Sequence, residues 1–408
     1  MKKIVITGMG AVTPVGIGVG TYWKNITEGV SGIDTIKTFN PSELAVQIAG
    51  EVKNFNPADY LAKDLIRKTD PFMQYAYVAA EEAIKQSNIE IQPEKTGIIM
   101  GTAMSGIATT AFTQDALSGA SHKKVGPRFI PKILGNIAAA NIAIDYHMQG
   151  PSFTISTACS SGGDAINTAC MCMQAGKADV MLAVGAESVL CPLVIYSLAN
   201  AKALSRRNDD PKTASRPFDA TRDGFVIGEG GGALVLETEE HALARGAVIY
   251  GELMGCGNTC DAHHVTAPHP EGRGAIACMK QALADAGLVP ADIGYINAHG
   301  TATHKGDSVE TEAIKTIFGE SLPFVSSTKG ATGHMMGAGG ITEVITCIKA
   351  IETGTLPPTI NLNEIDPACA GIDFVPNVAK QADIRYAMSN AFGFGGQNSS
   401  IIVGKYNG

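Results

Sequence analysis

The chain has 408 residues, 45% of them hydrophobic and 17% charged, with 47 glycines and a formal net charge of −8. This composition is typical of a compact, loop-dense globular protein and argues against a disordered chain. The acidic balance argues against a nucleic-acid partner. We expect no membrane partner, because no apolar run reaches the roughly 18 residues that a span needs. The nine cysteines lack regular spacing and the first residues read as a strand rather than a signal peptide, so we expect a cytoplasmic location.

Short strands bounded by glycine alternate with alanine-rich helices along the chain. The expected strands are 3–7, 96–100, 152–156, 179–184, 233–237, 294–297 and 400–403. The expected helices are 72–86, 164–175, 276–286 and 341–351. This alternation predicts an α/β layered fold. A charged helix near 239–245 marks a soft boundary without a linker, so we expect two intimately packed halves, 1–250 and 251–408.

Two patterns that suggest ligand sites have simpler explanations. Gly8 and Gly10 follow the first strand, but Thr13 stands where a dinucleotide-binding fingerprint needs its third glycine. A zinc site is suggested by a cluster that reads as one short loop, namely Cys256, Cys260, His263 and His264. Because no second ligand pair accompanies this cluster elsewhere, we expect no metal.

The most informative segment surrounds Cys159. The strand 152–156 leads through small residues into a helix that starts near Ser160, which predicts a sharp strand-to-helix turn at Cys159. The unpaired N–H groups at a helix N-terminus favour a thiolate over a thiol. The turn is analogous to the nucleophile elbow of hydrolases, with sulfur in place of oxygen. A buried structural thiol is the alternative, and this segment alone leaves both interpretations open.

Two histidines favour the reactive interpretation. His299 follows the expected strand 294–297, and His334 follows a strand at 324–326. Each histidine lies in a loop of small residues that follows the end of a strand. Ligands of α/β proteins usually bind at such strand ends. One such histidine alone is usually a satisfied loop residue. Two of them, together with a cysteine at a strand end, favour a common reactive centre.

Five motifs carry a family resemblance, and in chain order they are TACSSG, RPFDATRDGFVIGEGGGALVLE, NAHGTAT, STKGATGH and NAFGFGGQN. The chain resembles the β-ketoacyl-acyl-carrier-protein synthases, closest to the type II elongating enzymes of bacterial fatty-acid synthesis. The resemblance extends from Lys3 to Val403. It implies a thiolase-like α/β fold, with two pseudo-symmetric halves in a five-layer αβαβα arrangement, and a homodimer.

The resemblance also implies the catalytic residues. Cys159 would be the acyl-accepting nucleophile, with His299 and His334 as its catalytic partners. Lys329 would order the two histidines, and Glu343 would belong to the same network. The enzyme would bind no cofactor of its own, because phosphopantetheine is carried by the partner, an acyl carrier protein.

Further residues are implied in binding the substrate. The backbone N–H groups of Cys159 and Phe394 would form an oxyanion hole, and Phe394 would also gate the site together with the loop 261–266. Thr301 and Thr303 would contact the pantetheine arm. The other implied substrate contacts are Met104, Phe129, Ile195, Leu198, Thr266 and Phe392.

These roles imply a β-ketoacyl-ACP synthase of fatty-acid elongation. An acyl group moves from a carrier thioester to Cys159, and malonyl-ACP is then decarboxylated and condensed to a 3-oxoacyl-ACP. Two neutral imidazole Nε–H donors would stabilise the thioester oxygen of the intermediate enolate. A nearby cation such as Lys329 favours the neutral imidazoles.

An acidic carrier protein needs a basic docking face, although the whole chain is acidic. The candidates are Arg67, Lys68, Lys202, Arg206 and Arg207. A solvated charged surface is the alternative interpretation of these residues. Asp64 stands at a position that is usually basic in the family, which weakens the electrostatic match.

Departures from the family concern the acyl substrate. Elongating enzymes have glycines and a Phe where this chain has VIYSL at 194–198, and the added branched and aromatic bulk should re-line the tunnel. Met104 is longer than the usual branched residue, and His304 is unusual after NAHGTAT. The alternative function is therefore a ketosynthase of a type II polyketide or polyene pathway, in which a heterodimer with a chain-length factor replaces the homodimer.

Three other classes fit less well. Non-catalytic chain-length partners usually lack the reactive cysteine, whereas Cys159 is present. A thiolase needs a second reactive cysteine near the C-terminus, and 390–397 contains none. A cysteine hydrolase needs an Asn or Asp to orient a histidine, and neither adjoins His299 or His334 in sequence.

Overall fold

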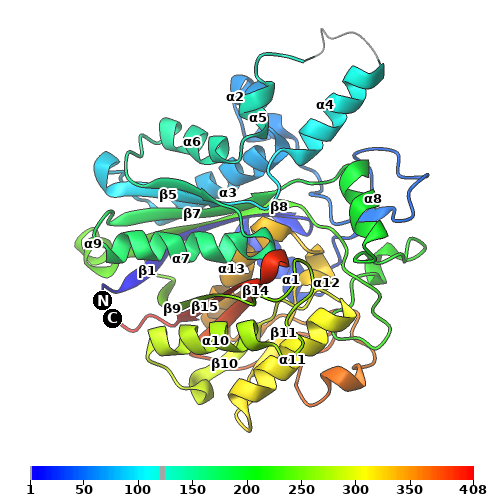
Figure 1. Cartoon of the computed structure of the whole chain (residues 1–408). Helices are drawn as coiled ribbons and strands as arrows, with labels where there is room; N and C mark the ends of the chain where they lie inside the picture. Colours follow the sequence, from blue (N-terminus) through cyan, green and yellow to red (C-terminus); the bar gives the residue numbers. More distant parts are fainter. Residues whose placement is uncertain (1, 120–124) are drawn as a thin grey trace.

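The computed structural model describes residues 2–119 and 125–408. Its main sheet has the strand order β11-β10-β14-β15-β9-β1-β8-β7-β5-β6 (Figure 1). Five of these strands come from the first part of the chain: β1 (Ile4–Thr13), β5 (Thr96–Gly101), β6 (Ser152–Ile155), β7 (Val180–Glu187) and β8 (Gly230–Thr238). The other five are β9 (Gly251–Cys260), β10 (Ile293–Asn297), β11 (Phe324–Ser326), β14 (Tyr386–Phe392) and β15 (Gln397–Gly404).

The two sets of strands repeat one pairing pattern. In the first, β5 pairs in parallel with β6 and β7, and β8 is antiparallel to β7 and β1. In the second, β10 pairs in parallel with β11 and β14, and β15 is antiparallel to β14 and β9. This repeated pattern confirms the expected pseudo-symmetric halves.

Strand β1 joins the two halves. Along its whole length β1 pairs with β8, from Ile4 opposite Thr238 onward. At its start it pairs with β9 as well, Ile4 opposite Leu253 and Ile6 opposite Gly251. The halves therefore share backbone hydrogen bonds, consistent with the missing linker in the sequence.

Helices form three further layers around the strands (Figure 1). The outer layer of the first half contains α3 (Pro71–Ser87) and α6 (Asn136–Asp145), and that of the second half contains α10 (Arg273–Ala286) and α11 (His304–Phe318). Between the strand layers lie α7 (Ser161–Gln174) and α13 (Gly339–Thr353), which contact strands of both halves. The five-layer α/β expectation is confirmed.

The two central helices approach each other at glycines. A Cβ atom added to Gly340 of α13 would lie 2.5 Å from the backbone nitrogen of Gly163 in α7. A Cβ atom on Gly162 would lie 2.7 Å from the carbonyl oxygen of Gly337. Real Cβ contacts are longer than this, so only glycine lets the two N-terminal ends meet.

The expected strands and helices are all present, with ends shifted by a few residues, except that β1 extends six residues further. Strands β9 and β14 are not among the strands expected from the sequence. Cys256 and Cys260 lie in β9, so the expectation that they belong to one short loop with His263 and His264 is wrong. Within 2–119 and 125–408, no helix combines the length and apolar character that crossing a membrane requires.

Shorter elements complete the fold. The helices are α1 (Val19–Thr27), α2 (Lys63–Lys68), α4 (Ile107–Gly119), α5 (Phe129–Ile133), α8 (Pro192–Asn200), α9 (Glu239–Ala244) and α12 (Lys329–Thr332). The strands are β2 (Gly16–Ile17), β3 (Asp34–Thr35), β4 (Ile48–Ala49), β12 (Thr355–Leu356) and β13 (Lys380–Gln381).

Candidate active site

Cys159 lies where β6 turns into α7. A single 3-10 turn, Ala158–Ser160, separates the strand segment from the helix. Ala158 has a φ of +52°, a left-handed conformation that costs a residue with a Cβ about 1–2 kcal/mol. The expected strand-to-helix turn is therefore present, and it is a strained one. Such strain is common where a backbone presents a reactive side chain.

His299 follows β10 in a loop that a buried carboxylate holds. Glu310 of α11 accepts hydrogen bonds from the backbone N–H groups of His299 and Gly300, each at 2.8 Å. The Ser327 hydroxyl donates to the carbonyl oxygen of Gly300 at 2.6 Å. These contacts fix the loop through its backbone and leave the imidazole of His299 uncommitted.

His334 follows the short helix α12. Its backbone N–H donates to the carbonyl oxygen of Val226 (2.7 Å), and its own carbonyl oxygen accepts from the N–H of Gly228 (2.8 Å). The Phe225 ring packs edge-on against the imidazole, with 5.5 Å between ring centres. His334 is thus anchored to the 225–228 segment of the first half, although it belongs to the second.

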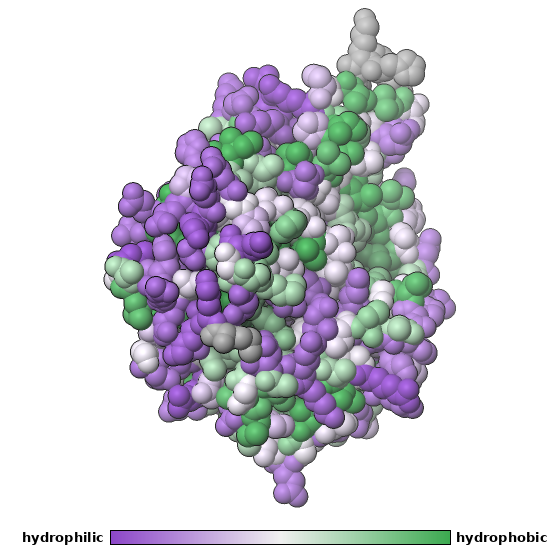
Figure 2. Space-filling model, turned by 60° about the vertical axis from the view of Figure 1, so that its left-hand side comes forward, coloured by the Kyte–Doolittle hydropathy of each residue, from purple (hydrophilic) through white to green (hydrophobic). Residues whose placement is uncertain are grey.

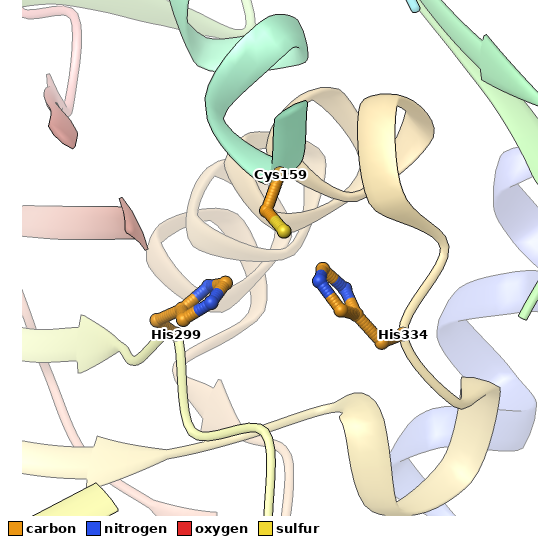
Figure 3. Close-up of side chains that lie close together, drawn as sticks. All are labelled: Cys159, His299 and His334. Atoms are coloured by element: carbon orange, nitrogen blue, oxygen red, sulfur yellow. The ribbon is translucent and has the colours of Figure 1, made fainter. Parts of the chain in front are cut away.

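The three side chains meet at one point (Figure 3). The sulfur of Cys159 and one nitrogen of each imidazole lie within 4.8 Å of one another. The two imidazole rings are 5.3 Å apart and nearly perpendicular. In Figure 3 the Cys159 side chain points from the end of α7 toward the space between the two histidines.

The imidazole hydrogen bonds indicate how the site is used. The backbone N–H of Met336 donates to Nδ1 of His334 at 3.4 Å, so the proton of a neutral ring belongs on Nε2. Within the described residues Nε2 of His334 has no partner, and neither has Nδ1 of His299. No carboxylate in this part of the chain hydrogen-bonds to either ring, which differs from a hydrolase triad.

Lys329 keeps both histidines neutral. It is buried and forms an ion pair with Glu343 of α13. Burial lowers the pKa of His299 and of His334 well below the usual range, and the positive charge of Lys329 lowers both further. Neutral imidazoles are therefore the resting form near neutral pH, as the electrostatic argument from the sequence requires.

Cys159 differs from the expectation. Burial raises the pKa of its thiol to about 11, although the N–H of Phe394, the charge of Lys329 and the N–H of Cys159 all lower it. The local donors favour the thiolate as expected, but the loss of hydration on burial outweighs them in the free protein and keeps the thiol protonated. The thiol must lose its proton when substrate binds.

The 393–396 segment packs directly on the nucleophile turn. A Cβ atom on Gly393 would lie 2.8 Å from the carbonyl oxygen of Thr157 and 3.2 Å from the nitrogen of Cys159. The backbone N–H groups of Phe394 and Cys159 both lower the pKa of the Cys159 thiol. The sulfur thus has two backbone donors and two imidazoles near it, which suits a reaction that develops negative charge on oxygen.

Family models account for most of the chain. The N-terminal domain of beta-ketoacyl synthases matches residues 1–242, and the C-terminal domain of the same family matches residues 250–363. The chain belongs to the beta-ketoacyl synthase family. It is 43% identical to "3-oxoacyl-[acyl-carrier-protein] synthase 2" of Staphylococcus aureus (strain COL), over 99% of both chains. The enzyme of the same name from Coxiella burnetii (strain RSA 493 / Nine Mile phase I) is also 43% identical, over 99% of both chains.

Solved structures agree with this assignment. A beta-ketoacyl synthase from Burkholderia phymatum STM815 is 34% identical, with a TM-score of 0.92 and full coverage of both chains. "The ishigamide ketosynthase/chain length factor" is 33% identical, with a TM-score of 0.93 and the same coverage. The beta-ketoacyl synthase described here is therefore a condensing enzyme with a thiolase-like fold.

The cluster around Cys159 of this beta-ketoacyl synthase is apolar. Met104, Ile195 and Leu198 belong to the same hydrophobic cluster as Cys159. Val194 is buried there as well, but Tyr196 is exposed and its hydroxyl donates to the carbonyl oxygen of Glu43 at 3.3 Å. The branched side chains of Val194 and Ile195 therefore face the cluster. The expectation that Tyr196 adds aromatic bulk there is wrong, because its side chain is exposed.

Other implied substrate contacts lie at different depths. The ring of Phe392 is 5.9 Å from that of His299. The hydroxyls of Thr301 and Thr303 lie 3.0 Å apart in the loop after His299. Thr266 is exposed in the loop after β9, and Phe129 is half-buried on α5, outside the cluster around Cys159. The loop 261–266 contacts the segment 393–396 directly, because the N–H of Gly395 donates to the carbonyl oxygen of Val265 (2.7 Å).

The basic residues form two groups on the surface. Arg67 and Lys68 end α2, where Lys68 pairs with Asp64 at 3.6 Å. Lys202, Arg206 and Arg207 follow α8, and Arg207 lies 3.8 Å from Asp223. Lys202, Arg206 and Arg67 are exposed. Each group therefore contains an acidic residue that reduces its positive charge.

Sequence reasoning missed two buried carboxylates in this beta-ketoacyl synthase. Glu310 holds the His299 loop, and the available signal was its spacing from Asp307, which accepts from the N–H of Thr301 at 3.0 Å. Residues three apart share a helix face, so both carboxylates face the loop. Asp164 lies two residues beyond the TACSSG motif but received no role, because one of its partners is 94 residues away.

Proposed function

We propose that this enzyme transfers an acyl group from an acyl carrier protein to Cys159 and condenses it with malonyl-ACP to give a 3-oxoacyl-ACP. The observation that carries the proposal is the meeting of the Cys159 sulfur with two neutral imidazoles within 4.8 Å. A thiol alone would suffice for acyl transfer. The two imidazoles, which hydrogen-bond to no carboxylate in the described residues, add the N–H donors that decarboxylation needs.

Acyl transfer uses the sulfur and the two backbone donors. Cys159 attacks the carbonyl carbon of the acyl thioester, and the oxyanion forms beside the N–H groups of Phe394 and Cys159. The carbon–sulfur bond to phosphopantetheine then breaks, and the proton that leaves the thiol of Cys159 ends on the departing thiol. The step is neutral overall and needs no redox group.

Condensation uses the imidazoles. Malonyl-ACP loses carbon dioxide, and His299 and His334 donate hydrogen bonds to the thioester oxygen, where the enolate charge develops. The enolate carbon attacks the acyl-Cys159 carbonyl, the bond to sulfur breaks, and the sulfur takes up one proton. Phosphopantetheine enters and leaves with the carrier protein as part of the substrate, while the enzyme keeps no cofactor of its own.

The carrier protein would dock on the two basic groups, Arg67 with Lys68 and Lys202 with Arg206 and Arg207. The solved structure "AntDE:AntF (apo): type II PKS acyl-carrier protein in complex with its ketosynthase bound to the hexaketide" is 33% identical to this chain, with a TM-score of 0.91 and full coverage of both chains. That ketosynthase is in complex with an acyl-carrier protein, which supports a carrier protein as the partner of this chain. The hydroxyls of Thr301 and Thr303 would contact the pantetheine arm.

We also propose a homodimer formed through β6. This strand lies at one edge of the main sheet. Its residue Phe153 is 52% exposed. At the opposite end β11 is covered, because the N–H of Val325 donates to the carbonyl oxygen of Asp373 at 2.9 Å. An open apolar edge strand is a pairing site. In Figure 2 hydrophobic residues gather along α4 and the surface directly below it, which would extend such an interface.

A polyketide or polyene ketosynthase is the second candidate. The related solved structures named for ketosynthases with chain-length factors favour it, as do Val194 and Ile195 in the acyl cluster. It shares the chemistry and differs in the acyl donor and in the partner, which would be a chain-length factor in a heterodimer. We further propose a cytoplasmic location and the division of the chain at 250/251.

Variants of the three central residues test the function. Cys159→Ala is expected to abolish condensation and to retain carbon dioxide release from malonyl-ACP, because the imidazoles remain. His299→Ala and His334→Ala should each lose carbon dioxide release by on the order of 100-fold or more. The measurements are product formation by mass spectrometry and carbon dioxide release.

The matched control is Cys172→Ala on the same helix, which should behave as the unaltered enzyme. Full condensation by Cys159→Ala would disprove the nucleophile, and unchanged carbon dioxide release in a histidine variant would remove that residue from the enolate site. Intact-mass measurement of Cys159 acylation across donors of different length separates the two pathways. Long saturated donors indicate fatty-acid elongation, and short or conjugated ones indicate the second candidate.

A further inference from the structure

We infer that Asp164 is a positioning residue that holds the nucleophile turn and connects it to the strand pair β9–β15. Its carboxylate is buried at the first turn of α7. It accepts a hydrogen bond from the Thr157 hydroxyl at 2.5 Å and one from the Ser160 hydroxyl at 3.0 Å. One carboxylate oxygen thus binds residues on both sides of Cys159.

The turn needs such a restraint because its backbone is strained. Ala158, between the two hydroxyl-bearing residues, has the left-handed φ of +52°. Local hydrogen bonds close the turn as well: the Thr157 N–H donates to the Ser161 hydroxyl oxygen (2.9 Å), and that hydroxyl donates to the Ala158 carbonyl oxygen (2.7 Å). These local bonds all lie within five residues, so they fix the shape of the turn but not its place in the site.

The second oxygen of Asp164 supplies the connection to the other half. The side-chain amide of Asn258 in β9 donates to it at 2.6 Å. Asn258 pairs with Ser399 of β15, and the next pair along the strands is Thr259 with Asn398. Asp164 therefore connects the nucleophile turn to the strand pair β9–β15. The gate segment 393–396 directly precedes β15.

The same strand pair holds the second donor of the site. The Asn398 side chain donates to Asp261 Oδ1 at 2.8 Å and to the carbonyl oxygen of Gly396 at 3.2 Å. The N–H of Asp261 donates to the carbonyl oxygen of Gly396 at 2.8 Å. Phe394, whose N–H lowers the pKa of the Cys159 thiol, lies within this held segment, and a Cβ atom on its neighbour Gly393 would lie 3.2 Å from the nitrogen of Cys159. Asp164 thus fixes the separation between the sulfur and a donor from the other half.

The inference rests on the proposed nucleophile, and its test does not need the condensation. Asp164→Leu should slow acylation of Cys159 by on the order of 100-fold while the KM for the acyl donor stays unchanged, because the reacting atoms lose alignment. Alkylation of Cys159 by iodoacetamide, followed by mass spectrometry against pH, should show a higher apparent pKa, since the Phe394 donor is displaced. Global destabilisation alone would lower the folded fraction without moving this pH profile.

Conservative and partner variants complete the experiment. Asp164→Asn combined with Asn258→Asp keeps an oxygen for Thr157 and Ser160 and exchanges donor and acceptor in the contact between residues 164 and 258, so it should restore the acylation rate and the pH profile. Thr157→Val, which retains the buried carboxylate, should shift the alkylation profile in the same direction even if Asp164→Leu does not fold. The control Asp145→Asn, at an exposed partner of Tyr77, should change neither readout.

Two results would overturn the inference. One is an alkylation profile and acylation rate for folded Asp164→Leu, or for Thr157→Val, that match the unaltered enzyme. The other is an Asp164→Asn, Asn258→Asp double variant as impaired as Asp164→Leu, which would show that these hydrogen bonds do not position the turn. Because iodoacetamide requires neither carrier protein nor malonyl thioester, a failed condensation proposal leaves the alkylation result interpretable.

Discussion

Lys329 influences the active site through its charge, and not through contact with a reacting atom. It lowers the pKa of both imidazoles and that of Cys159, while its ion pair with Glu343 keeps the lysine charge compensated inside the protein. A buried ion pair of this kind is costly to desolvate and adds little stability by itself. Its value here is electrostatic, because it keeps two histidines neutral beside each other.

Removing this charge should move the pH dependence of decarboxylation. Protonation of His334 puts a proton on Nδ1, which can then no longer accept from the Met336 N–H that holds the ring, and Lys329 lowers the pKa at which this happens. Lys329→Met leaves Glu343 without its cation, so the histidine pKa values rise and carbon dioxide release should fail at a pH higher by on the order of one unit. The assay is carbon dioxide release from malonyl-ACP across the acid range.

The exposed Lys280 of α10 provides the control, and Lys280→Met should reproduce the unaltered profile. An acid limb that stays in place in Lys329→Met, with the enzyme folded, would mean that burial alone keeps the histidines neutral. Thus the variant separates the two causes of the low pKa, burial and the lysine charge.

At the scale of elements, the crossing of α7 and α13 depends on glycine. Gly340→Ala would put a methyl group 2.5 Å from the nitrogen of Gly163, so the helices must separate. We expect a loss of about 1–3 kcal/mol in the free energy of unfolding, as for other overpacked sites. Denaturant unfolding followed by circular dichroism measures it.

The matched substitution is Gly20→Ala in α1, where an added Cβ has no atom within 4 Å. That variant should be as stable as the unaltered enzyme or more stable, by up to about 1 kcal/mol, because alanine favours helix. Equal stability of Gly340→Ala and the unaltered enzyme would show that the crossing tolerates a wider separation.

The sequence predicts elements well where their signal is local. The first strand and the helix α3 have clear apolar runs and were located to within a few residues at most ends. Strand β9 reads GELMGCGNTC and has few of the residues that favour strands, since its conformation comes from pairing with β15 and β1. The Cys159 turn was likewise visible in the sequence, whereas its thiol pKa depends on burial by distant segments and was not.

At the scale of the molecule, the uncovered edge of β6 should control assembly. Phe153→Asp would place a charge on the proposed dimer edge and is expected to convert the dimer to monomer. Light scattering after size-exclusion chromatography measures the change. Val378→Asp, at a position 75% exposed outside β6, is the control and should remain dimeric. A Phe153→Asp protein that stays dimeric at low concentration would require a different interface.

The pairing of β1 has a consequence for how the enzyme is made. Ile4 is synthesised long before its strand partners Thr238 and Leu253. At roughly 5–20 residues per second, β1 waits on the order of ten to fifty seconds for these neighbours to be synthesised. During that time a strand that is fully buried in the fold stays unpaired, so the nascent chain depends on protection from aggregation until both halves have emerged.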